Sequence, residues 1–140
     1  MRKRLLFPLL LLLITACGTE APVIKTQLHL VQGVGFETLL EGTADLDGGR
    51  IEQSLKGKSL PIDLQVVVTR EGEIEDFTQQ TLTFKLQERG DQFVLTYDEA
   101  SGPSEPVTAP KANGLESFLK SASEQIATIA NAQRDRLKTP

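Results

Sequence analysis

Apolar and polar residues alternate with a period of two over much of the stretch 24–100. Such alternation is typical of strands that bury one face of a sheet and expose the other. It is clearest over 60–70, where every second residue is apolar. The residues that would share the inner face there are Leu60, Ile62, Leu64, Val66 and Val68. Short sequences rich in glycine and charge separate the alternating segments and predict turns.

The same pattern predicts a strand over 36–46 and a returning strand over 50–55. We expect Asp47-Gly48-Gly49 to close the hairpin between them, because Asp-Gly accepts the positive φ of a tight reversal. Ile51, Gln53 and Leu55 would then share one face of the returning strand. Pro61 predicts that the strand over 60–70 begins at a sheet edge or a bulge, since proline cannot donate to a ladder.

The periodicity changes near the C-terminus. Residues 101–112 hold three prolines, which predicts a loop. Over 113–138 the period becomes helical, with Asn113 as the expected N-cap and Glu116 completing a loose capping box. Asn131 and Arg134 are predicted on the polar face of this helix. Its apolar face would be formed by Leu115, Phe118, Leu119, Ala122, Ile126, Ile129 and Leu137.

These elements predict one globular domain over 24–140, with strands over 24–100, a Pro-rich loop over 101–112 and a helix over 113–138. The fold class is α+β: an antiparallel β-meander of five to six strands, covered by one C-terminal amphipathic helix. A strongly apolar helical stripe must be buried, and the open face of the sheet is the simplest surface to cover it.

The first residues have a different organisation. Three basic residues at positions 2–4 precede an apolar run over 5–14, which is the layout of a secretory signal peptide over 1–16. A membrane-spanning helix needs about 20 apolar residues, so this run is too short to be a permanent span.

Ile14-Thr15-Ala16-Cys17 resembles the lipobox of bacterial lipoproteins, and Cys17 is the only cysteine of the chain. The resemblance implies cleavage between Ala16 and Cys17 and lipidation of the Cys17 sulfur. Acyl chains on Cys17 would then hold the protein in a membrane. Residues 17–23 would form a short tether of at most about 20 Å.

The resemblance also implies a location in the cell envelope. Bacterial lipoproteins with aspartate after the cysteine tend to stay at the inner membrane, whereas this chain has Gly18. We therefore expect the periplasmic face of the outer membrane if the source is Gram-negative, and otherwise the outer face of the plasma membrane.

The net charge narrows the choice of partners. The whole chain carries a formal charge of −4, and loss of the three basic residues within 1–16 would leave −7. An acidic domain is repelled by nucleic acid, so we predict no nucleic-acid partner. The chain has no Trp and one Tyr, which argues against a broad stacking platform for bases or sugars.

Two acidic clusters are candidate sites. Asp45, Asp47 and Glu52 superficially resemble a calcium loop, but the 12-residue spacing of such a loop is absent, and a hairpin turn is the alternative. The second cluster, an acidic run, could do acid–base chemistry only if burial raised one pKa, and a solvated turn is the alternative. Its members are Glu71, Glu73, Glu75 and Asp76.

His29 is the sole histidine, so it cannot build a multi-histidine metal site, and we expect it to lie exposed on a strand. The sequence therefore predicts no metal, no cofactor and no catalytic residues.

Three hypotheses follow. The first is a non-enzymatic, membrane-anchored accessory domain that binds an envelope protein through a strand edge or the Pro-rich loop. The alternative is a carrier or binder of lipid or another apolar ligand between sheet and helix. The third is an enzyme, for which alanine substitution of Asp45, Asp47 and Glu75 would be the test.

Overall fold

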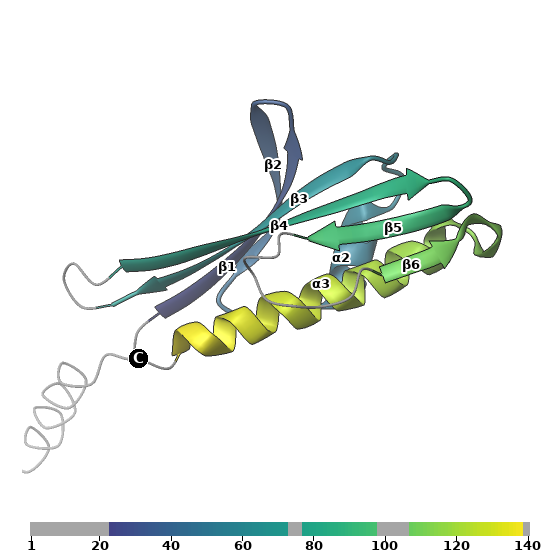
Figure 1. Ribbon diagram of the computed structural model, residues 1–140. Coiled ribbons are helices and arrows are strands. Elements are labelled where there is room, and N and C mark those ends of the chain that lie inside the picture. The colour runs from purple at the N-terminus through teal and green to yellow at the C-terminus, as the bar shows by residue number, and fades with distance from the viewer. Residues whose placement is uncertain (1–22, 73–76, 98–106, 139–140) are drawn as a thin grey trace, which may run out of the picture.

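The computed structural model of the protein describes residues 23–72, 77–97 and 107–138. In these ranges six antiparallel strands form one open sheet, and a long helix lies along one of its faces (Figure 1). The predicted α+β class is confirmed. The strands are β1 (Val23–Gln32), β2 (Gly35–Gly42), β3 (Ile62–Glu71), β4 (Phe77–Arg89), β5 (Gln92–Tyr97) and β6 (Val107–Pro110). The helices are α2 (Gly48–Leu55), a short 3-10 helix η3 (Lys111–Asn113) and α3 (Leu115–Lys138).

The strand order is β2-β1-β3-β4-β5-β6, so it departs from sequence order at one point. β1 and β2 form a hairpin across a two-residue turn, in which Gly33 takes the positive φ of 60° that tight hairpins require. β3 then returns beside β1 instead of beside β2. This leaves β2 at one edge of the sheet and β6 at the other.

The prediction of a strand over 50–55 is wrong, because these residues belong to α2. Asp47 is the helix N-cap: its side chain accepts a hydrogen bond of 2.7 Å from the backbone N–H of Gly49. Ile51 and Leu55 are fully buried, whereas Gln53 between them is exposed. Residues four positions apart share a face in both a helix and a strand, so the spacing of the two apolar residues was ambiguous.

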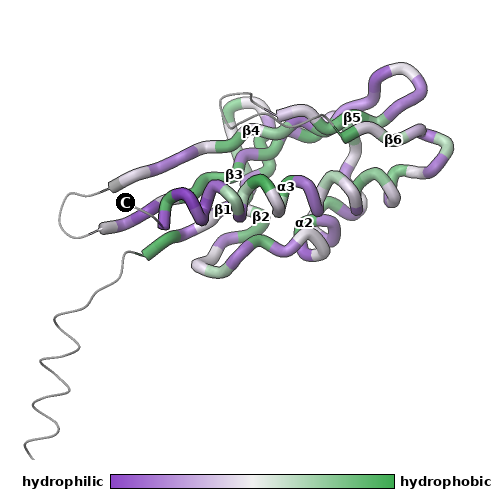
Figure 2. The backbone as a smooth tube through the Cα atoms, turned by 60° about the horizontal axis from the view of Figure 1, so that its bottom comes forward, coloured by the Kyte–Doolittle hydropathy of each residue, from purple (hydrophilic) through white to green (hydrophobic). Residues whose placement is uncertain are grey.

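Alternate side chains of β1, β3 and β4 point toward the helices. Figure 2 shows α3 running along the sheet with α2 beside it. Residues from both layers fill the space between them, and Phe93 of β5 stacks on Phe118 of α3 with ring centroids 5.3 Å apart. The largest fully buried side chains include Leu28, Leu64, Val66, Phe84, Phe118 and Ile126. Docking of the C-terminal helix on the sheet is therefore confirmed.

Three boundaries differ from the prediction. Pro61 lies just before β3, which is an internal strand, so this proline stands outside the ladder instead of marking an edge. Part of the expected Pro-rich loop is β6, which pairs with β5. Asn113 ends η3, and α3 begins only at Leu115, so Asn113 is not the cap of the long helix.

The register defines two ends of the sheet. At one end Val23 of β1 lies opposite Glu71 of β3, and the C-terminal part of α3 lies nearby, since Arg134 contacts the carbonyl oxygen of Ile24 at 3.5 Å. The turn between β1 and β2 lies at the far end of β1. A ten-residue strand spans about 33 Å, so this turn is far from Val23.

Candidate functional site

The β1–β2 hairpin carries exposed apolar side chains at its tip. Val34 in the turn is fully exposed, and Phe36 on β2 is 69% exposed. Phe36 lies directly opposite Val31 of β1, so both project from the face of the sheet that α3 does not cover. Figure 1 shows this hairpin standing out from the rest of the sheet. The hairpin tip is therefore an apolar surface with access to solvent.

His29 of β1 packs against Phe36 of this surface. It is 8% exposed, so the prediction of an exposed histidine is wrong. Its ring meets Phe36 edge-on with centroids 4.7 Å apart, and its Nδ1 lies 3.1 Å from the Thr38 hydroxyl oxygen. His29 is buried because β1 lies between β2 and β3, so that neighbouring strands flank the ring on both sides.

The outer edge of β2 is open among the described residues, since β1 is the only strand there that pairs with it. The register shifts between Leu28 and His29 of β1, so β2 has an irregularity in its middle. On the outer face Glu41 accepts a hydrogen bond of 3.1 Å from Gln27. Each edge strand presents a row of backbone groups that another strand can bind.

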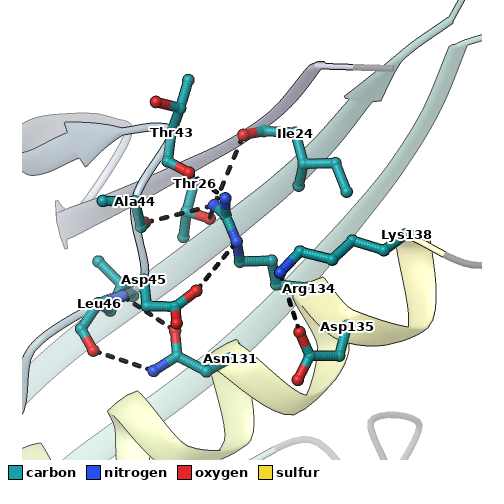
Figure 3. Close-up of polar contacts among 10 residues, drawn as sticks. All are labelled: Ile24, Thr26, Thr43, Ala44, Asp45, Leu46, Asn131, Arg134, Asp135 and Lys138. Carbon is teal, nitrogen blue, oxygen red and sulfur yellow. Dashed lines mark hydrogen bonds and ion pairs between the residues drawn. The ribbon is translucent and has the colours of Figure 1, made fainter. Parts of the chain in front are cut away.

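A cluster on α3 holds the segment that joins β2 to α2 (Figure 3). Arg134 is only 9% exposed, and its Nη1 donates to the Thr26 hydroxyl and to the carbonyl oxygen of Ala44, both at 3.3 Å. Its Nη2 donates to the carbonyl oxygen of Thr43. Its Nε lies 3.1 Å from a carboxylate oxygen of Asp45, which forms an ion pair.

Asn131 holds the same segment one helical turn earlier. Its side-chain amide donates to the carbonyl oxygen of Leu46 at 3.0 Å and accepts from the backbone N–H of Leu46 at 2.9 Å. We call Asn131 and Arg134 the α3 latch. Four of its hydrogen bonds go to backbone groups of residues 43–46, so it fixes where β2 ends and where α2 begins.

Asn131 and Arg134 were predicted on the polar face of the helix, facing away from the sheet. This prediction is wrong, because both side chains bind residues of the sheet or of the segment that follows β2. Arg134 continues a buried row spaced by four residues, which runs through Ala122, Ile126 and Ala130. Thr26 likewise stands in the inward-facing row of β1 and is 1% exposed. A polar residue in each of two apolar rows was a sequence signal that these residues bind each other.

Three of the candidate acidic residues that the structure describes have structural partners, whereas Glu52 of α2 lies in the wall of an open hollow. Asp45 pairs with Arg134, and Asp47 caps α2. Glu71 pairs with Lys25 at 3.0 Å. Glu73, Glu75 and Asp76 lie outside the described residues. Within the described ranges, no group of three or more His, Cys, Asp or Glu side chains lies close enough to hold a metal ion.

Two open hollows lie on the surface formed by the described residues. One, of about 320 Å³, lies between α2 and the start of α3, with Glu52, Lys56 and Glu116 in its wall. The other, of about 410 Å³, lies beside the end of β1 and the start of β3, with Lys58 and Asp63 in its wall. Both are lined in part by charged side chains.

Ala16 and Cys17 lie outside the described residues. Among the helices that the structure describes, none has the length and hydropathy to cross a membrane. The sequence matches no protein-family model and no curated protein, and the fold matches no solved structure.

Proposed function

We propose that the protein is an exported lipoprotein, held in the cell envelope by acyl chains on Cys17, and that its domain binds a protein partner without catalysing a reaction. The basic residues, the apolar run and the lipobox-like 14–17 support the anchor. In a Gram-negative source the domain would lie on the periplasmic face of the outer membrane. In a source with one membrane it would lie on that membrane's outer face.

An anchor at Cys17 would determine which end of the sheet faces the membrane. β1 begins at Val23, six residues after Cys17, so the end of the sheet that contains Val23 would face the membrane. The hairpin turn lies at the other end of β1 and would point away from the lipid. The domain would therefore present the hairpin tip to other molecules of the envelope.

One observation supports the binding role most directly. Val34 and Phe36 are exposed together at the hairpin tip, although large apolar side chains elsewhere in the described residues are mostly covered. Apolar side chains that gather on an exposed surface often mark a site of protein interaction. The carrier alternative stays a prediction.

The anchor is tested by intact-mass measurement of the protein extracted from membranes of its source. We expect a chain that begins at Cys17 and carries the mass of a diacylglyceryl group, with or without an N-acyl chain. Cys17→Ser should remove the lipid mass and release the protein from the membrane. A bare thiol on an anchored wild-type chain, or equal membrane binding by Cys17→Ser, would contradict the proposal.

Two further variants sharpen this test. Gly18→Ala should leave the lipid mass and the membrane fraction unchanged, so it is the control for substitution beside the anchor. In a Gram-negative source Gly18→Asp should move the protein from the outer to the inner membrane. Fractionation of the two membranes measures this shift.

A further inference from the structure

The outer edge of β2 is long and is not blocked by proline or lysine. Native proteins usually shield an edge with a short strand, proline, charged side chains (lysine above all), a bulge or a covering helix or loop. β2 has eight residues and contains neither proline nor lysine. Its protective features are the irregularity opposite Leu28 and His29 and the charges of Glu37 and Glu41, and regular pairing with β1 resumes on both sides of the irregularity.

The charged residues of β2 and of the segments on either side of it are acidic, although Arg134 pairs with one of them, Asp45. From Gly33 to Gly49 the chain contains four acidic residues and no Lys or Arg. Two of them, Glu37 and Glu41, lie on β2 itself. Lys58 pairs with one of them: its Nζ lies 3.6 Å from a carboxylate oxygen of Glu37. The Glu37 side chain stays 63% exposed in that pair, so its charge is open to another partner.

The side chains of β2 would meet a partner strand on both faces of the sheet. Phe36 projects from the face that α3 leaves open, as its contact with His29 shows. Glu37 is next in the chain, points to the other face and pairs with Lys58. Cross-strand pairs of opposite charge, and of aromatic with aliphatic side chains, stabilise neighbouring strands.

We propose that β2 binds an extended, positively charged segment of an envelope protein, which adds to the sheet as a further strand. Backbone hydrogen bonds at the open edge would supply affinity, as in other cases of strand addition. Basic side chains of the segment would face Glu37 and Glu41, and an apolar one would cover Phe36. A second copy of this chain fits less well, because two paired β2 strands would bring four glutamates together. The location of the partner rests on the proposed function.

The test uses the full chain, acylated and expressed in its source organism. A photoreactive phenylalanine analogue replaces either Phe36 on β2 or Thr108, an exposed residue of β6 at the opposite edge. After irradiation of intact cells, crosslinked peptides are identified by mass spectrometry. We expect the analogue at Phe36 to crosslink to a segment of another protein that carries net positive charge, and the analogue at Thr108 to give no such product.

Charge reversal provides the matched comparison. The double variant Glu37→Lys with Glu41→Lys should lower the Phe36 crosslink about tenfold, since it places like charges opposite each other. Glu88→Lys is the control: Glu88 also pairs with a lysine, at 3.4 Å, and its side chain is similarly exposed at 56%. The control should leave the yield unchanged. Should the double variant not accumulate, Val34→Lys in the exposed turn should lower the yield without disturbing an ion pair.

Four outcomes would overturn the strand-addition proposal. These are a Phe36 crosslink to lipid or to a second copy of the chain, no crosslink from Phe36, an uncharged or acidic target segment, and equal yields from the double variant and the control. A protein captured from Thr108 alone would leave the proposed binding function standing and reject β2 as its site. The intact mass of the same sample reports Cys17 lipidation separately, so failure of the anchor is seen independently of the crosslink.

Discussion

The two edges of the sheet differ in the properties that decide whether an edge accepts another strand. β6 has four residues and ends in Pro110, whereas β2 has eight residues and no proline. β6 also lies against α3 and continues into η3. β2 instead projects with the hairpin tip, where Phe36 is exposed. One edge is thus short and lies against α3, whereas the other is longer, contacts α2 over part of its length and carries the exposed tip.

The two edges are also held differently. The residue after β6, Lys111, donates its backbone N–H to the carbonyl oxygen of Asp91 at 2.9 Å and pairs through its side chain with Glu88. β2 is fixed at its base by the α3 latch, one to four residues after the strand ends. Residues nearer the tip are held by β1 and by the small cluster around His29. The comparison teaches that an open edge can be rigid at its base and accessible at its tip.

The largest expected effect comes from breaking the latch. Arg134→Ala leaves the backbone carbonyls of Thr43 and Ala44 and the hydroxyl of Thr26 without their donor. We expect a loss of about 3 kcal/mol in the free energy of unfolding, because one buried and two part-buried acceptors lose a charged donor together. Urea unfolding measures this loss.

Arg134→Ala should also affect the two edges of the sheet differently. Hydrogen exchange should speed up in β2 and in residues 43–46 more than in β6. Arg136→Ala, two residues along the same helix, is the control and should change stability by less than about 0.5 kcal/mol. Equal loss of protection in β2 and β6 would show that the latch does not act on one edge.

A second test concerns the close approach of the two helices. A Cβ added at Gly48 would lie 3.0 Å from the Cα of Glu124, so Gly48→Ala forces α2 and α3 apart. We expect a loss of about 2 kcal/mol by overpacking, although alanine is normally the better helix former. At Gly42, at the end of β2, an added Cβ would have only an ordinary contact at 3.9 Å. Gly42→Ala in the same urea titration is therefore the control, and an unchanged midpoint for Gly48→Ala would refute the close approach.

A third test concerns α2, the helix in the connection between β2 and β3. Asp47→Ala removes the cap of α2, and loss of such a cap costs about 1 kcal/mol. Asp47→Asn should retain most of the stability, since asparagine caps as well as aspartate. Thermal or urea unfolding of the two variants tests this order. Equal destabilisation by both would mean that the negative charge, and not the cap, is what matters.

The smallest effect is expected at the hairpin tip. Phe36→Ser removes an edge-to-face contact with His29, and such aromatic pairs contribute about 0.5–1.5 kcal/mol. Because Phe36 is mostly exposed, we expect the low end of this range in urea unfolding. Val34→Ser should have no measurable effect on stability, since its side chain is fully exposed. A large loss from Val34→Ser would indicate that the tip is buried against something in the folded protein.

Much of the fold could be predicted from local patterns. The alternation over 60–70 predicted β3, because a strand with one buried face needs apolar residues at every second position. The helical spacing after residue 113 predicted α3, because a helix with one buried face needs apolar residues at every third or fourth position. The segment 50–55 was misread, since Ile51 and Leu55 fit both periods and the glycines after Asp47 also fit a turn. The exposure of Gln53 decides between them, and exposure is a property of the folded chain.

The candidate site was predicted less well. The sequence pointed to a strand edge as one surface for a partner, but it did not say which strand would form the edge. That choice depends on α2, which carries the chain across so that β3 pairs with β1. The burial of His29 follows from the same strand order. Arg134 was assigned to the polar face because its charge was weighed above its place in a buried row.

By itself, the sequence determined the periods of the elements, the class of the fold and the resemblance of 14–17 to a lipobox. These features depend on residues that are close together in the chain. The tertiary structure decided the strand order, the burial of Arg134 and His29, and which edge stays open. Those features depend on contacts between residues far apart in the chain, such as Thr26 with Arg134, and local periodicity does not specify such pairs.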